Sequence, residues 1–129
     1  MGNFDYVKPK TLAEALEYLD RHGPESRLMA GGTDLLVLVR RNLATPAHLV
    51  DVKGIAETGR LEFIPGQGLF IGASVTVNEA ALAEAVKERY PALAQAAGSL
   101  ASYQVRNRAT LVGNICNASP GADLAPPLL

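Results

Sequence analysis

The sequence predicts a mixed fold in which short helices and short strands alternate. Capping boxes at Thr11 with Glu14 and at Thr76 with Glu79 each predict a helix start, because the hydroxyl bonds forward to the backbone and the carboxylate bonds back. Apolar runs on either side of Pro65–Gly68 predict a β-hairpin. The chain has 129 residues, close to one domain in length, and its 48% apolar content argues against disorder.

In the first half, a helix is expected to begin at Thr11 and to end at Gly23, in the left-handed conformation, before Pro24. Its apolar residues form one stripe: Leu12, Leu16 and Leu19. Strands are expected over residues 27–30 and 48–52. Between them, residues 35–39 fit either a buried helical turn or a strand, because periodicity cannot separate the two in so short a run.

In the second half, strands are expected over residues 61–64 and 69–71, and one helix from Thr76 to just before Pro91. An Ala-rich helix follows over about residues 92–100. Residues 102–129 are rich in Asn, Gly, Pro and Ser and lack clean periodicity, so they are expected to be a functional loop or part of a larger unit. The chain ends on Leu128-Leu129, which favours a truncation.

Composition excludes several classes of function. With 12 Lys and Arg against 13 Asp and Glu, the net charge of -1 argues against nucleic acid or an anionic membrane as partner. No apolar run approaches the roughly 20 residues of a spanning helix, and residues 1–5 show no signal pattern. A single cysteine, Cys116, forms no internal disulfide and cannot alone hold an iron–sulfur cluster. We expect a cytoplasmic protein.

The first segment that carries chemistry is Ala30–Leu35. Gly31 and Gly32 follow a strand, so the backbone can approach a ligand closely and adopt positive φ. Successive N–H groups can then form an anion-binding nest that suits a pyrophosphate. Thr33 adds a hydroxyl. An ordinary tight turn capped by Asp34 is the alternative.

The second segment begins with Thr110–Asn114 and continues to Asp123. It offers uncharged hydrogen-bonding side chains at Thr110, Asn114, Asn117 and Ser119, and the Asp123 carboxylate could accept from a ribose hydroxyl. Arg106 and Arg108 could steer an anionic cofactor. A polar loop held by Asx turns is the alternative. Neither a P-loop nor a Rossmann glycine fingerprint is present.

Four motifs in order carry a family resemblance. They are Ala30–Leu35 (Ala-Gly-Gly-Thr-Asp-Leu), Ile71–Thr76 (Ile-Gly-Ala-Ser-Val-Thr), Thr110–Ile115 (Thr-Leu-Val-Gly-Asn-Ile) and Ala118–Leu124 (Ala-Ser-Pro-Gly-Ala-Asp-Leu). This order resembles the FAD-binding subunit or domain of the molybdenum hydroxylases, such as the medium subunit of aerobic carbon monoxide dehydrogenase and the flavin domain of xanthine dehydrogenase. Val112 replaces the first glycine of the family's pair, which is costly only if that position needs positive φ.

The resemblance implies an α+β fold of the PCMH type, with a small α/β subdomain over residues 1–54 and a larger sheet-and-helix subdomain over 55–129. The family's domain is longer, so the second subdomain is expected to be incomplete. FAD would lie between the two, with its pyrophosphate held by both glycine-bearing segments. The cofactor-binding residues implied are Leu28, Met29, Ala30, Gly31, Gly32, Thr33, Asp34, Leu35, Leu100, Thr110, Gly113, Asn114 and Asp123.

The resemblance also implies an oxidoreductase component that takes electrons from iron–sulfur clusters on a small partner subunit and passes them through FAD to an acceptor. The substrate would be oxidised at a molybdenum cofactor on a large subunit, in a heterotrimer or its dimer. No catalytic side chain and no metal ligand is expected in this chain, and this piece alone is expected to be inactive. The alternatives are another PCMH-type flavoenzyme and a truncated, non-catalytic assembly domain.

Other residues are expected to have structural roles. Cys116 is expected to be a small buried filler and Tyr103 a core aromatic. His22 and His48 are expected to lie apart from each other, with no part in catalysis. Arg40 and Arg41 are expected to be solvated.

Overall fold

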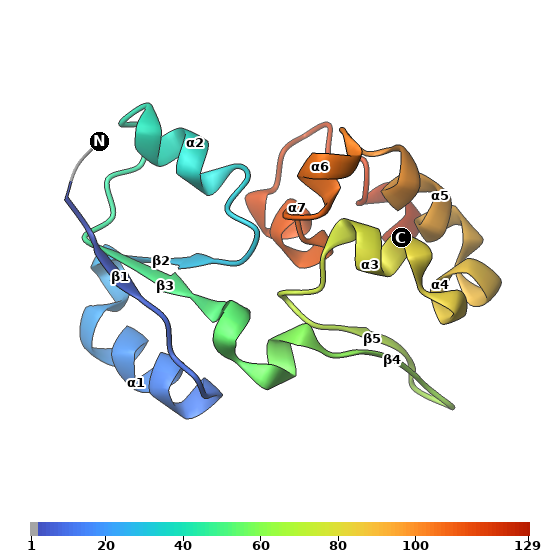
Figure 1. Cartoon of the computed structure of the whole chain (residues 1–129), viewed down its shortest axis with the longest axis horizontal. Helices are drawn as coiled ribbons and strands as arrows, with labels where there is room; N and C mark the ends of the chain where they lie inside the picture. The colour runs from blue at the N-terminus through green and yellow to red at the C-terminus, as the bar shows by residue number, and fades with distance from the viewer. Residues whose placement is uncertain (1–2) are drawn as a thin grey trace.

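The computed structural model describes residues 3–129 and shows an α+β protein; Met1 and Gly2, part of the N-terminal stretch without a signal pattern, lie outside the described residues. Its first half is built on a parallel sheet with strand order β1-β3-β2, formed by Asp5–Val7, Ser26–Met29 and His48–Asp51. Helices α1 (Leu12–His22) and α2 (Leu35–Arg40) connect these strands and lie on opposite sides of the sheet in Figure 1. Residues 35–39, for which the sequence fitted either a helical turn or a strand, therefore form a helix. Strand β1 was not predicted.

Helix α1 begins where predicted but packs differently. The Thr11 hydroxyl accepts from the Glu14 N–H at 3.2 Å, whereas the Glu14 carboxylate accepts from the Lys10 N–H rather than from that of Thr11. The predicted stripe is not the core face: Leu16 is 57% exposed, and Ala15, at 3%, is the buried residue. Ala15 packs with Val52 and Ile55, so a small side chain lets the helix approach the segment after β3.

The end of α1 also differs from the prediction. Gly23 is right-handed (φ -48°) and begins a 3₁₀ turn, Gly23–Glu25, so its assignment as a left-handed cap is wrong. Pro24 fits the first turn of that 3₁₀ segment because a first-turn N–H needs no partner there.

The second half starts with 3₁₀ turns Val52–Gly54 and Ala56–Gly59 and the predicted antiparallel hairpin, β4 (Leu61–Ile64) and β5 (Gly68–Ile71). The Thr76–Glu79 capping box is complete. The prediction of a single helix before Pro91 is wrong. Helices α3 (Val77–Leu82) and α4 (Glu84–Arg89) are separated by Ala83, whose ψ of 129° is extended. Helix α5 spans Pro91–Ser99.

Residues 102–129 are not the aperiodic loop that their composition predicts. They contain α6 (Tyr103–Arg106), α7 (Leu111–Asn117) and a 3₁₀ turn, Pro126–Leu128. Leu111 and Leu124 join the larger buried cluster with side chains from α3, α4 and α5, so the tail is held by the core. Tyr103, however, is 56% exposed and is not a core aromatic.

Among the helices of residues 3–129, none has the length and apolarity that crossing a membrane requires.

Candidate functional site

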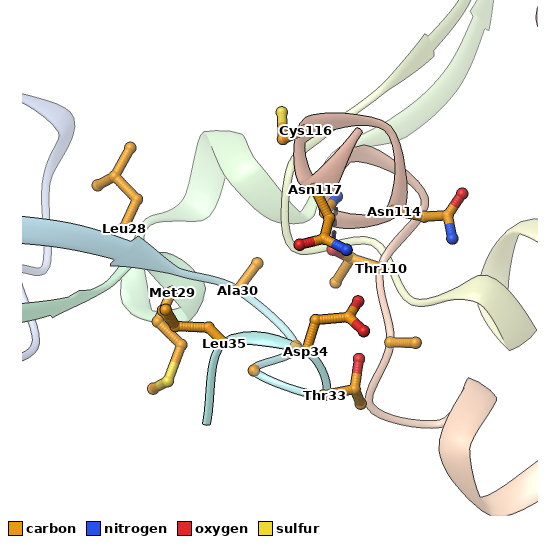
Figure 2. Close-up of a pocket in the computed structure, with 14 residues that line it drawn as sticks. Leu28, Met29, Ala30, Thr33, Asp34, Leu35, Thr110, Asn114, Cys116 and Asn117 are labelled. Carbon is orange, nitrogen blue, oxygen red and sulfur yellow. Dashed lines mark hydrogen bonds between the residues drawn. The ribbon is translucent and has the colours of Figure 1, made fainter. Parts of the chain in front are cut away.

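The two glycine-bearing segments meet in space. The loop after β2 and the start of α7 line one hollow of about 220 Å³. Its lining comprises the continuous run 28–35 together with Ala109, Thr110, Gly113, Asn114, Cys116 and Asn117. Figure 2 shows Asp34 and Thr33 extending from the first segment toward Thr110 of the second. Of the predicted site residues, only Leu100 and Asp123 do not line the hollow.

Positions 31 and 32 each require glycine, but for different physical reasons. Only Gly32 is left-handed, with φ +76°. A side chain at Gly31 would instead meet the backbone of the second segment, since a Cβ there would lie 2.2 Å from the Arg108 carbonyl oxygen. Gly31 therefore lets the two segments touch, and Gly32 lets the chain turn into α2.

The first segment offers unused hydrogen-bond donors. Within residues 3–129, the N–H groups of Gly31 through Asp34 donate to no acceptor, and α2 begins when the Leu36 N–H reaches the Gly32 carbonyl at 3.0 Å. Asp34 stands at the N-cap of α2 but makes no capping hydrogen bond. The simple Asp-capped turn therefore does not describe this loop, and its donors are free to meet a ligand.

The second segment is a helix start. The Thr110 hydroxyl accepts from the Gly113 N–H at 3.0 Å, and a Cβ at Gly113 would lie 2.6 Å from that hydroxyl oxygen. Glycine at 113 therefore makes room for the cap. Val112 lies in the first turn of α7 and is not among the positive-φ residues, so valine costs no backbone strain there.

Replacing Thr110 with alanine should lower the free energy of unfolding by about 1–2 kcal/mol, because a buried N-cap hydroxyl is lost. Denaturant unfolding of the full-length protein measures this. Thr45→Ala is the matched control, since Thr45 is exposed and makes no hydrogen bond within the described chain. Equal unfolding midpoints for the two variants would show that the cap contributes nothing.

Ala109, Cys116 and Asn117 line the hollow but were not among the predicted cofactor-binding residues, although Asn117 was noted as a hydrogen-bonding side chain of the second segment. Asn117 is three residues after Asn114 and four after Gly113, so all three lie on one side of α7. Predicting this helix would have placed Asn117 with Gly113 and Asn114 in the site. Cys116 is exposed, so its assignment as a buried filler is wrong. Leu100 packs against the larger core cluster and Asp123 is exposed, so neither is placed beside a ligand in the hollow.

A buried ion pair lies behind the first segment. The Asp51 carboxylate, at the end of β3, is 2.8 Å from the Lys53 ammonium and accepts from the Tyr6 hydroxyl. Burial alone would raise the pKa of Asp51, but the hydrogen bonds from Lys53 and Tyr6 together hold it below its ordinary value. The same hydrogen bond to Asp51 raises the pKa of Tyr6.

Other charged groups have structural partners. Arg106 donates to the Asn78 amide oxygen at 3.0 Å and to the Leu100 carbonyl at 2.8 Å, so it braces α6 instead of steering an anion. His22 and His48 are not apart: their rings lie 4.5 Å from each other, centre to centre. Tyr18 completes this cluster through a 2.9 Å hydrogen bond to His48. Arg40 and Arg41 are exposed, as predicted.

Comparison with known protein families identifies the family to which the chain belongs. The model of the FAD binding domain in molybdopterin dehydrogenase matches residues 2–129. The chain belongs to this family. The FAD-binding chain is 38% identical to the carbon monoxide dehydrogenase medium chain of Hydrogenophaga pseudoflava over 93% of its own length. It is 36% identical to the xanthine dehydrogenase FAD-binding subunit of Escherichia coli O157:H7 over 96% of its own length.

The fold is shared with solved structures of the same kind. Carbon monoxide dehydrogenase from Hydrogenophaga pseudoflava superposes with a TM-score of 0.90 at 36% identity, covering 95% of this chain and 42% of that one. The chain likewise spans 42% of the length of both relatives named above.

The residues of the hollow fit FAD. Asn114 lines it, and its side-chain oxygen is buried without a partner within the described residues, an arrangement that native proteins rarely tolerate unless a donor arrives. In Figure 2 the Asn114 amide extends away from Asn117, so the two present polar groups in different directions. Hydroxyl and ring N–H groups of FAD are suitable donors for Asn114, and its phosphate oxygens are suitable acceptors for the free loop N–H groups.

Proposed function

We propose that this chain forms part of the FAD-binding, electron-transferring subunit of a molybdenum-containing hydroxylase. The observation that supports this most strongly is the shared hollow, in which both glycine-bearing segments present uncharged donors. FAD supplies the electron-carrying chemistry when bound, and the chain supplies binding and orientation. The partners in this proposal are an iron–sulfur subunit and a molybdenum-cofactor subunit, in a heterotrimer or its dimer within the cytoplasm.

The loop N–H groups and the Thr33 and Thr110 hydroxyls would hold the diphosphate. The hollow, at about 220 Å³, is smaller than the roughly 300–1,000 Å³ of a complete small-molecule site, so it suits one part of a dinucleotide. Among residues 3–129, no lysine or arginine lines it. Affinity for FAD should therefore depend only weakly on salt, unlike binding by ion pairs.

The division of the chain into subdomains 1–54 and 55–129 belongs to the same proposal. It is supported by the parallel sheet, which lies within residues 5–51, and by the larger buried cluster, which lies within residues 75–124.

The proposal is tested by purifying the full-length protein with its co-purifying chains and recording its visible spectrum. We expect a flavin spectrum, and release of intact FAD on denaturation. A colourless protein that binds no FAD at about 100 μM would refute the proposal. A flavin that stays covalently attached would favour a different flavoenzyme of the same fold.

Replacing Asn114 with leucine should weaken FAD binding about tenfold or more without lowering the melting temperature of the FAD-free protein. The reason is that an apolar side chain of similar size removes an unpaired buried oxygen, which is neutral or favourable for folding but costs a ligand hydrogen bond. Flavin fluorescence titration and thermal unfolding measure the two effects. Gln95→Leu, at an exposed position on α5, is the matched amide control. Unchanged FAD affinity in Asn114→Leu would remove Asn114 from the site.

A further inference from the structure

We propose that Lys53 is a positioning residue for FAD: held by Asp51, it fixes the Ala30 carbonyl and so orients the Gly31 N–H toward the diphosphate. This inference rests on the proposed function. Lys53 does not line the hollow and belongs to none of the four motifs.

The contacts form a continuous chain from the sheet to the loop. The Lys53 ammonium lies 2.8 Å from the Asp51 carboxylate and donates to the Ala30 carbonyl at 2.7 Å. Asp51 itself is 1% exposed, pairs with Met29 across the sheet, and accepts from the Lys53 N–H at 2.9 Å. Its second oxygen accepts from the Tyr6 hydroxyl. The ammonium is thus held by a carboxylate whose own position is fixed by these contacts.

Fixing the Ala30 carbonyl fixes the next N–H. The peptide group between Ala30 and Gly31 is planar and trans, so its C=O and N–H point in opposite directions. A carbonyl held on the Lys53 side therefore sends the Gly31 N–H to the other side. That N–H donates to no acceptor within residues 3–129, and Gly31 lines the hollow.

The loop is restrained from two directions. On the side of the second segment, the Arg108 carbonyl oxygen lies 2.2 Å from the position that a Cβ of Gly31 would take. On the side of the sheet, the Lys53 ammonium holds the preceding carbonyl. Restraint of this kind increases affinity because the ligand need not order the loop on binding.

The role assigned to Lys53 differs from direct attraction of phosphate. Its charge is compensated by Asp51, and its ammonium donates to the Ala30 carbonyl and does not itself line the hollow. FAD affinity should therefore fall when Lys53 is removed, while the dependence of that affinity on salt should stay the same. A lysine paired with phosphate would reduce the salt dependence when removed.

The experiment uses full-length protein stripped of flavin and titrated with FAD at low and high salt. The variants are Lys53→Met, the double variant Lys53→Met with Asp51→Asn, and Lys87→Met as a matched control from the exposed face of α4. The double variant removes the unpaired buried charge that would destabilise Lys53→Met alone. We expect the double variant to melt within a few degrees of the wild type and to bind FAD about tenfold more weakly. Lys53→Arg should recover part of the affinity, and Lys87→Met should bind as the wild type does.

Two results would overturn the inference alone: wild-type FAD affinity in the double variant, or a salt dependence that falls with Lys53. A wild-type protein that binds no FAD would instead overturn the proposed function and this inference with it.

Discussion

Replacing Gly31 with alanine should abolish FAD binding and lower the free energy of unfolding by about 3 kcal/mol. The added Cβ would lie 2.2 Å from the Arg108 carbonyl oxygen and 2.9 Å from its carbon, contacts that real Cβ atoms do not make. Both atoms belong to the backbone, so no side-chain rotation relieves the overlap. The loop after β2 and the segment before α7 must move apart, and the hollow between them opens.

Two glycine variants make this prediction specific. Gly32→Ala should cost less, about 1–2 kcal/mol, because its main penalty is the left-handed φ of +76°. Gly98→Ala on α5 should leave stability equal or slightly higher, since no atom of the described part of the chain lies within 4 Å of the added methyl group. Denaturant unfolding and FAD titration of the full-length protein measure all three. If Gly31→Ala unfolds and binds FAD as Gly98→Ala does, the two segments are not in contact as described.

The sequence correctly predicted those elements whose formation depends on residues close together in the chain. The Thr76–Glu79 box formed completely because both partners lie within one helical turn, and the hairpin at Pro65–Gly68 formed because its turn residues admit positive φ at Gly66 and Gly68. The two candidate segments were also identified correctly as neighbours. That step depended on a family resemblance, because nothing local relates residue 31 to residue 113.

Tertiary contacts account for what the sequence did not predict. Thr110 begins a helix because its hydroxyl accepts a hydrogen bond from the Gly113 N–H. The sequence did not predict this helix, because a stretch rich in Asn and Gly shows no apolar periodicity. His22 and His48 are distant in sequence but come together because α1 ends beside the first residue of β3. From the sequence alone, Lys53 cannot be distinguished from a surface lysine, because only the fold of β3 places Asp51 beneath the loop.

Replacing Asp51 with alanine should lower the free energy of unfolding by about 3 kcal/mol near neutral pH. Removing one partner of a buried pair costs roughly 3–5 kcal/mol, and the lower end applies because Lys53 keeps some contact with water. Tyr6 also loses its acceptor. Asp20→Ala is the matched control, because Asp20 is exposed on α1 and makes no hydrogen bond among the described residues, and its effect should be within about 0.5 kcal/mol.

The pH dependence separates loss of this charge from loss of packing. The pKa of native Asp51 is below the ordinary 3.8, so its stabilising contribution is complete above that pH and is lost as pH falls through the native value. The pKa of Tyr6 is above its ordinary 10.0, so its contribution is complete below pH 10 and is lost as pH rises through the raised value. The stability gap between wild type and Asp51→Ala should therefore be constant from about pH 5 to 8 and should narrow in acid and in strong alkali. A gap that stays constant in acid would mean that Asp51 stabilises the sheet through its volume, and that its charge does not hold the loop through Lys53.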